Sequence, residues 1–396
     1  TRGAMLQGRI ADIVQFQATI LENQSYFPNY LRQITDSLGF GNIDKFGVVP
    51  GFGRTKPFYI TGYDYSISSG WIFVRPWKWM DLQLGHGKHI VGNGYRSLLL
   101  SDAAYNYPFA KATAYLAGGR IQYSYITMQF QSLQRLPRLE VPEALFAKKA
   151  GTVHFVDFVP FDNFSIGLFE GNVWQRWDTS GVRALPWQAY VPVAGIASLT
   201  HGESSTWFSL TGLNLRWRIN PHVMTYGQLA YDGNNEAVGW QAGFRFFDLG
   251  IKRLDLRVEF NSTGDNFYSN RAGAENYTHM NQPIGYIAGA AVNEMIVQGA
   301  LNRRRFFIKA SVNYLEQKTS VEGRILDRNL SDTLSYPVRH VNQVMAETGW
   351  VFNPKTNLQL AFGINRRLDR AGTYRLETTA LYVAFRTAIY NRYMDF

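Results

Sequence analysis

The stretch Leu254-Asp255-Leu256-Arg257-Val258-Glu259-Phe260 alternates apolar and charged side chains without interruption. Successive side chains of a β-strand point to opposite faces of a sheet, so this stretch predicts a strand with one apolar and one polar face. The same period of two recurs in residues 14–20, 212–217, 306–313, 358–365 and 381–390. The pattern therefore predicts an all-β protein.

A membrane-spanning helix is not expected in this chain. Such a helix needs about 18 or more consecutive apolar residues, and the most apolar stretch, Ile284–Ala291, is short and contains glycine. A closed β-barrel is the other structure that satisfies every backbone group in lipid. Charged residues make up 18% of the chain and aromatic residues 15%. That balance suits a barrel, in which only alternate residues meet lipid.

A soluble β-sandwich also alternates, so loop lengths matter. The expected strands are long, and tight turns alternate with long polar segments, as in an outer-membrane barrel with short periplasmic turns and long extracellular loops. The tight turns are Arg75-Pro76-Trp77, Pro160–Asn163, Asn220-Pro221-His222 and Asn353-Pro354-Lys355, and the long segments are Gln24–Pro57, Ser262–Gln282 and Gln317–Arg339.

Aromatic residues cluster beside these tight turns. We expect them to form the girdle of a barrel at the membrane interface, with core aromatics at strand ends as the alternative. They are Trp77, Trp79, Phe158, Phe161, Trp217, Phe247, Trp350 and Phe352.

The strand count predicts an incomplete barrel. Strands are expected near 2–9, 13–22, 64–76, 78–89, 110–118, 120–131, 151–159, 163–172, 206–218, 222–232, 238–247, 253–262, 287–299, 304–316, 340–352, 357–368 and 374–392, which is about seventeen. Bacterial single-chain barrels have even counts, so we expect about eighteen, with at least one strand upstream of Thr1. The chain begins without an initiator Met or signal peptide, and residues 1–396 are expected to form one barrel domain lacking its upstream residues. The last strand and Phe396 suggest the terminal signal that barrel-assembly machinery recognises.

The charge and cysteine content exclude several functional classes. There is no cysteine, which rules out disulfides, thiolate metal sites and a cysteine nucleophile. The net charge of +10 is dispersed, with Arg303-Arg304-Arg305 as the densest run. Nucleic acid is therefore not the expected partner. The surplus of positive charge suits an anionic polysaccharide or lipopolysaccharide better.

The densest cluster of unusual residues is Gln83–Asp102, which we expect to follow a strand and enter a loop or short helix. His86 and His89 could ligate a metal, but no further ligand stands at a convincing spacing. The glycines fit neither nucleotide-binding fingerprint, so a structural role in the lumen is expected. No G-x-S-x-G elbow occurs. The inward-facing charges are expected to pair across strands in the lumen, and they are Asp255, Arg257, Glu259, Lys309 and Arg216. No enzyme, metal or cofactor is predicted.

The cluster also carries a family resemblance. Residues 85–102 with Asn106-Tyr107-Pro108 resemble the Wzi-like capsule-assembly family of outer-membrane barrels, in its Bacteroidota branch, which includes gliding-motility proteins of the RemB type. Weaker matches are Thr1-Arg2-Gly3, Glu22-Asn23-Gln24, Phe27-Pro28, Gly167–Glu170, Asn276–His279 and Asn281-Gln282-Pro283. The resemblance implies a barrel of about eighteen strands in the outer membrane of a Gram-negative bacterium and an association with surface polysaccharide.

The expected function is therefore non-enzymatic: binding or organising capsule or exopolysaccharide, or supporting gliding motility. An accessory subunit of a larger outer-membrane secretion or motility complex, with other outer-membrane proteins or lipoproteins as partners, is one alternative, and a diffusion porin is another. Segments Tyr26–Leu38, Pro142–Lys149 and Val182–Ala197 are expected to form short helices over or into the lumen. The candidate ligand contacts, placed at the long-loop rim, are His86, His89, Asn93, Tyr95, Arg96, Asp102, Tyr105, Tyr277 and His279.

Overall fold

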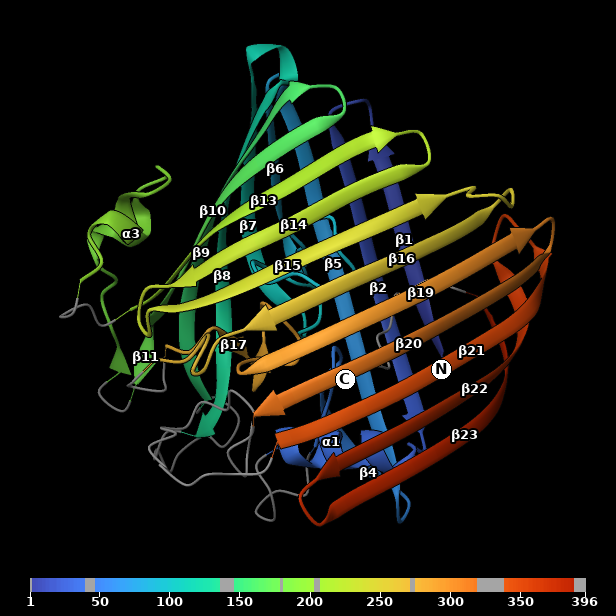
Figure 1. The fold of residues 1–396 in the computed structure, drawn as a ribbon. Coiled ribbons are helices and arrows are strands. Elements are labelled where there is room, and N and C mark those ends of the chain that lie inside the picture. Colours follow the sequence, from blue (N-terminus) through green and yellow to red (C-terminus); the bar gives the residue numbers. More distant parts are fainter. Residues whose placement is uncertain are drawn as a thin grey trace.

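A computed structural model describes residues 2–39, 47–135, 146–178, 181–202, 207–270, 275–318 and 338–387. Seventeen long antiparallel strands wrap around an interior, each hydrogen-bonded to the next along the chain (Figure 1). They are β1 (Arg2–Ile10), β2 (Val14–Ser25), β5 (Gly62–Trp77), β6 (Met80–Gly87), β7 (Tyr107–Leu116), β8 (Ile121–Arg135), β9 (Phe146–Phe161), β10 (Phe164–Gln175), β13 (Phe208–Asn220), β14 (Val223–Asp232), β15 (Ala237–Phe247), β16 (Leu254–Thr263), β19 (Val292–Arg303), β20 (Phe306–Lys318), β21 (Val338–Asn353), β22 (Leu358–Ala371) and β23 (Tyr374–Thr387).

All seventeen strands expected from the sequence are confirmed, most with ends shifted by a few residues. The sequence did not predict the short strands β3 (Val48–Val49), β4 (Gly53–Phe58), β11 (Trp177–Asp178), β12 (Gly181–Val182), β17 (Thr278–His279) and β18 (Gln282–Pro283). Within the described residues β1 pairs with β2 alone and β23 with β22 alone. The eighteenth strand stays a prediction, and the terminal residues 388–396 lie outside the described part.

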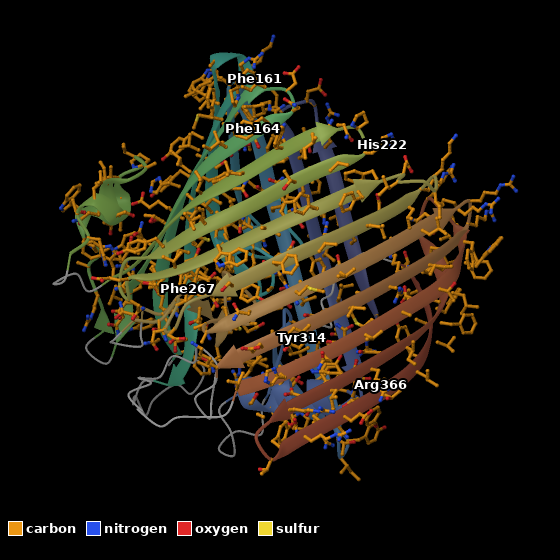
Figure 2. The ribbon with its side chains drawn as sticks, viewed as in Figure 1. Phe161, Phe164, His222, Phe267, Tyr314 and Arg366 are labelled. Atoms are coloured by element: carbon orange, nitrogen blue, oxygen red, sulfur yellow. The ribbon has the colours of Figure 1, made fainter. Side chains whose placement is uncertain are left out.

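The connections differ between the two rims of the barrel. Short turns such as residues 11–13, 162–163 and 221–222 close one rim, and the long segments lie at the other. The expected alternation is confirmed, although Arg75-Pro76-Trp77 lies within β5 rather than in the turn that follows it. Figure 2 shows Phe161, Phe164 and His222 at the short-turn rim. Seven of the eight girdle aromatics are exposed there, whereas Phe247 is half-buried beneath the Arg245 guanidinium.

The two faces of the wall have opposite chemistry. Large apolar side chains such as Leu229, Trp240, Val344 and Phe362 are exposed on the outer face, while Gln228, Gln241 and Gln343, on the alternate positions, are buried inside. An apolar outer belt with a polar interior is the arrangement of an outer-membrane barrel, because only the outer face meets lipid. In the ranges that the structure describes, no helix is long and apolar enough to cross a membrane.

One segment, the strap (residues 183–202), lies outside the barrel wall. It contains the helical turns η2 (Trp187–Tyr190) and α3 (Ile196–Leu199), and Figure 1 shows α3 beside the outer surface, between the two rims. The prediction that Val182–Ala197 covers or enters the lumen is therefore wrong. Glu170 of β10 explains the difference: it points outward, yet it is only 3% exposed because the strap covers it.

Helix α1 (Asn29–Leu38) confirms the expected helix at the long-loop rim. Its buried side chains, Tyr30, Leu31, Ile34, Thr35 and Leu38, follow the period of a helix with one apolar face. That face packs on Val48, Leu133 and Phe146. Of the third expected helical segment, residues 142–145 lie outside the described part and residues 146–149 belong to β9.

Candidate functional site

The lumen is filled by the plug (residues 88–106), which leaves β6 and folds inward before β7 begins. It contains no helix and forms a bridge between Val91 and Leu100. Leu98, Leu99 and Leu100 are fully buried against aromatic and aliphatic side chains of the wall. Burial of each leucine contributes about 1.5–3 kcal/mol, so the plug is a packed element.

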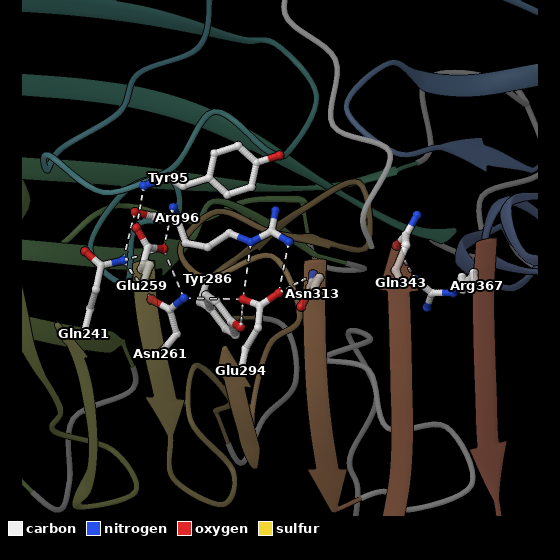
Figure 3. Close-up of polar contacts among 10 residues, drawn as sticks. All are labelled: Tyr95, Arg96, Gln241, Glu259, Asn261, Tyr286, Glu294, Asn313, Gln343 and Arg367. Atoms are coloured by element: carbon white, nitrogen blue, oxygen red, sulfur yellow. Dashed lines mark hydrogen bonds and ion pairs between the residues drawn. The ribbon is translucent and has the colours of Figure 1, made fainter. Parts of the chain in front are cut away.

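Two carboxylates of the wall hold the plug (Figure 3). One accepts hydrogen bonds from the plug backbone, and the other forms an ion pair with a side chain of the plug. Glu259 of β16 accepts hydrogen bonds from the backbone N–H groups of Tyr95, at 2.6 Å, and Arg96, at 3.0 Å. Glu294 of β19 forms an ion pair with the Arg96 guanidinium at 3.1 Å, and both side chains are almost completely buried. A buried charge is tolerated when it is paired and hydrogen-bonded, and both conditions are met here.

Neutral wall side chains complete these contacts. Tyr226 donates to Glu259 at 2.7 Å and Asn313 donates to Glu294 at 2.8 Å, and Tyr286, outside the wall strands, also donates to Glu294. Side-chain amides of the wall also form hydrogen bonds with the plug backbone. Gln228 donates to the Val91 carbonyl at 2.9 Å, and Gln241 donates to the Arg96 carbonyl at 3.0 Å. Together these hydrogen bonds form a polar network that fixes one position of the plug.

A glycine is required where the plug approaches the wall. Gly92 has a φ of 133°, and a Cβ atom there would lie 2.2 Å from Nε2 of Gln228. Only glycine adopts this conformation without strain and leaves room for the amide. The expectation that the glycines of this cluster serve tight backbone turns in the lumen agrees with this geometry.

A second inward segment (residues 264–270 and 275–291) covers the plug from the side of the long loops. Tyr268 donates to the Leu98 carbonyl at 2.5 Å and Tyr277 donates to the Leu99 carbonyl at 2.7 Å. Ser101 donates through its backbone N–H to the Ile284 carbonyl at 2.7 Å. The hydroxyls thus satisfy carbonyls of the leucine run that would otherwise be buried without partners.

Two plug-associated histidines are held neutral. Nδ1 of His279 accepts from the Gln131 backbone N–H at 3.0 Å, and its Nε2–H donates to the Asn106 carbonyl at 3.1 Å. Burial lowers the pKa of His279 to about 3 and, with the nearby charge of Lys111, that of His89 to about 3. Burial also lowers the pKa of Lys88 to about 8, partly offset by Asp102. Its ammonium donates to the carbonyls of Gly51 and Asp102.

The nine candidate ligand contacts all belong to the plug or to its packing partners. Arg96, Tyr277 and His279 are buried and form an ion pair or hydrogen bonds within the chain. Tyr105 stacks on the His279 ring. The remaining candidates are partly buried, and they are His86, His89, Asn93, Tyr95 and Asp102. Any ligand contact by these side chains stays a prediction. No group of three metal-ligating side chains occurs among the described residues.

The sequence missed an exposed cluster at the long-loop rim, the rim aromatic patch (Tyr26, Phe58 and Tyr59). Ring centroids of Phe58 and Tyr59 lie 4.5 Å apart, and those of Tyr26 and Phe58 lie 6.2 Å apart. Tyr59 is 80% exposed at the tip of the β4–β5 hairpin. It has a φ of 50°, a conformation that costs a non-glycine residue about 1–2 kcal/mol. The unpredicted strand β4 is what raises these rings above the rim.

Lumen charges outside the plug contacts do not pair as the sequence suggested. Among the described residues Arg216, Arg257, Lys309 and Asp255 form no ion pair within 4 Å. Glu259, the remaining member of the expected set, binds the plug instead.

Comparisons with known proteins agree with this architecture. No protein-family model and no curated protein sequence matches the chain. Among solved structures it resembles Wzi of Escherichia coli, an outer-membrane protein involved in group 1 capsule assembly and described as a carbohydrate-binding β-barrel. The TM-score is 0.56 at 11% identity, over 95% of this chain and 81% of that one.

Two outer-membrane proteins of Pseudomonas aeruginosa are also similar. OccK10 (OpdN) has a TM-score of 0.47 at 8% identity, over 98% of this chain and all of that one. OprD has a TM-score of 0.44 at 11% identity, over 94% and 91%. The likeness to Wzi shows the fold. With the apolar outer belt, it identifies an all-β barrel of the outer membrane.

Proposed function

We propose that this chain is a non-enzymatic outer-membrane barrel that binds surface polysaccharide at its long-loop face, and so retains or organises it. The observation that carries the proposal is the rim aromatic patch: Tyr26 and Tyr59 are 62% and 80% exposed and frame Phe58 on the side where extracellular loops lie. Aromatic faces present large apolar area with a polar edge, which suits the alternating apolar and hydroxyl surfaces of a sugar ring.

Two further observations support this proposal over diffusion through the lumen. The plug and residues 264–270 and 275–291 place fully buried side chains in the interior, whereas a diffusion porin needs an unobstructed path. The neighbour with the same fold and the better superposition, Wzi, is described as carbohydrate-binding. The net charge of +10 favours an acidic polymer.

The binding test uses the purified barrel in detergent and the capsule or exopolysaccharide of the organism itself. We expect retention of the barrel on immobilised polymer, and Phe58→Ala and Tyr59→Ala each to weaken it ~2- to 10-fold. Phe161→Ala is the matched control, because Phe161 is an exposed aromatic at the opposite rim. No retention of the wild type, or equal loss in Phe161→Ala, would contradict the proposal.

The porin alternative predicts a different measurement. A porin passes ions steadily in a planar bilayer, whereas the packed plug leaves only small or brief conductance. Steady large channels from the wild-type barrel would therefore favour the porin and remove the main support for a closed lumen.

A second candidate, membership of a larger outer-membrane assembly such as a motility or secretion complex, is favoured by the strap. Its irregular backbone lies against the outer wall between the rims, where lipid offers no hydrogen bonds. Its outer surface is apolar, with Trp187, Tyr190 and Leu199 exposed. A protein neighbour would cover both features.

Photo-crosslinking in intact envelopes tests this second candidate. A photoreactive side chain at Leu199 is expected to form an adduct with one outer-membrane protein that also co-purifies with the untreated barrel. The control is the same group at Val344, an exposed position on β21 away from the strap. Adducts with lipid alone, or identical adducts at both positions, would contradict the assembly.

A further inference from the structure

A cavity lies in the lumen on the short-turn side of the plug. The basic vestibule, as we name it, has a volume of about 460 Å³ and is lined by four basic side chains, Arg245, Arg257, Lys309 and Arg386, and by two acidic ones, Asp255 and Glu347. Arg245, Asp255 and Arg386 lie within two residues of the ends of β15, β16 and β23 at the short-turn rim. The vestibule therefore lies toward the rim that faces the periplasm.

Two of its cations face each other across neighbouring strands. Arg245 of β15 is the direct partner of Arg257 in the register of β16, and both side chains point into the lumen. Like charges directly opposite in an antiparallel pair are destabilising. Neither guanidinium forms an ion pair within the described part of the chain, so the repulsion is not cancelled by a carboxylate in contact with them.

The acidic groups near the vestibule do not neutralise its basic side chains, because they bind other partners or are outnumbered. Glu347 binds Arg386 at 2.5 Å and accepts from Tyr382 at 2.9 Å, while Lys309 occupies the opposing register position on β20. One carboxylate thus stands between two cations. Glu259, the next inward residue of β16 after Arg257, is taken up by the plug. The vestibule keeps an uncompensated positive charge.

The remaining contacts of Arg257 prepare it for an anion. Its guanidinium donates to Gln298 at 3.3 Å and lies 5.7 Å from the centre of the Tyr95 ring. Tyr95 belongs to the plug and lines the vestibule on that side. Its Nε–H is buried without a hydrogen-bond partner among the described residues. An arginine held by an aromatic face and an amide, with a free donor, is preorganised for bidentate binding of an oxyanion.

We propose that the basic vestibule binds a phosphate-bearing small molecule from the periplasmic side, with Arg245 and Arg257 as the phosphate ligands and Lys309 as a flanking cation. A phosphate monoester or diphosphate brings two or more negative charges, which would relieve the repulsion between the two guanidiniums. The volume admits a phosphate together with a sugar-sized group. This site lies on the other side of the plug from the rim aromatic patch and does not depend on it.

Calorimetric titration of the full chain in detergent tests the site with inorganic pyrophosphate, glucose 1-phosphate and glucose as probes. We expect saturable binding of both phosphates and none of glucose. Arg245→Gln and Arg257→Gln are expected to weaken phosphate binding ~10- to 100-fold. Arg216→Gln is the matched control, because Arg216 is also an unpaired lumen arginine but lines a different cavity, and it should change affinity less than twofold.

Several outcomes would overturn the site. They are no saturable binding of either phosphate by the wild type, unchanged affinity in Arg257→Gln, or equal weakening in Arg216→Gln. Equal binding of glucose and glucose 1-phosphate would show that the sugar, not the phosphate, is recognised. Arg257→Lys keeps the charge without the planar fork, and intermediate binding by this variant distinguishes phosphate recognition from a collapsed lumen. Loss of polysaccharide retention at the rim leaves these results unaffected, so the two proposals fail separately.

Discussion

The guanidinium of Arg96, in the plug, lies 3.1 Å from the carboxylate of Glu294, on β19, and the two side chains are 3% and 0% exposed. The two residues are 198 positions apart in sequence. Their contact joins an inward loop to the wall in the middle of the lumen, and it makes the plug position testable by single substitutions.

Removal of Glu294 is expected to loosen the plug. Glu294→Ala leaves the Arg96 guanidinium buried without its counter-charge, which costs about 3–5 kcal/mol. Ion conductance in planar bilayers should rise above that of the wild type. Glu377→Ala is the matched control, since Glu377 pairs with Arg366 at the exposed surface, where such pairs contribute about 0–1 kcal/mol. Equal conductance in both variants would count against the plug contact.

A methyl group at Gly92 should have a similar effect by another route. Gly92→Ala combines an unfavourable φ with a clash against Gln228, so the plug must shift or strain by about 1–3 kcal/mol. Thermal unfolding of the purified barrel should begin at a lower temperature, with increased conductance. At Gly202 a Cβ atom meets open space, so Gly202→Ala should behave as the wild type does. The idea fails if Gly92→Ala is as stable and as closed as that control.

Acidification is expected to destabilise the plug. His89 and His279 have pKa values of about 3 in the folded chain against 6.5 when unfolded. Between these values the unfolded state binds more protons, so the free energy of unfolding falls as pH drops from 6.5 toward 3. The slope is about 1.4 kcal/mol per pH unit for each histidine at most.

Thermal unfolding measured at pH 7, 5 and 4 checks this dependence. Conversion of His89 and His279 to Gln should flatten the loss below pH 6.5, even though it removes hydrogen bonds at neutral pH. His222→Gln, at the exposed short-turn rim, should leave the slope unchanged. A slope that survives in the double variant would assign the acid sensitivity to other groups.

Glu170 is expected to hold the strap against the outer wall. Its carboxylate accepts from the Gly195 N–H at 2.6 Å and from the backbone N–H and hydroxyl of Ser198, both at 2.7 Å. Charge-assisted hydrogen bonds contribute about 1.5–3 kcal/mol each, so Glu170→Ala should release the strap. Trypsin should then cleave after Arg183 faster than in the wild type. Glu22→Ala, an exposed carboxylate elsewhere, should cleave at the wild-type rate.

The strands could be predicted from the sequence because the signals that define them lie within or next to each strand. The alternation in Leu254–Phe260 sets which side chains face the lumen, and tight turns such as Asn220-Pro221-His222 set the ends of strands. All seventeen long strands and the difference between the rims follow from these two signals. The inward direction of Glu259 also follows, since it alternates with Val258 and Phe260.

The tertiary structure alone decided what the inward and outward loops do. Alternation places Glu259 in the lumen, but nothing near it in sequence identifies Tyr95 and Arg96, more than 160 positions away, as its partners. The strap turns outward because Glu170 on the outer wall supplies the acceptor it needs. Loops carry no hydrophobic period of their own, so their positions depend on which charged side chains of the wall are left to bind them. The sequence thus determined the strands of the barrel wall, and the contacts across its lumen determined where the plug lies within it.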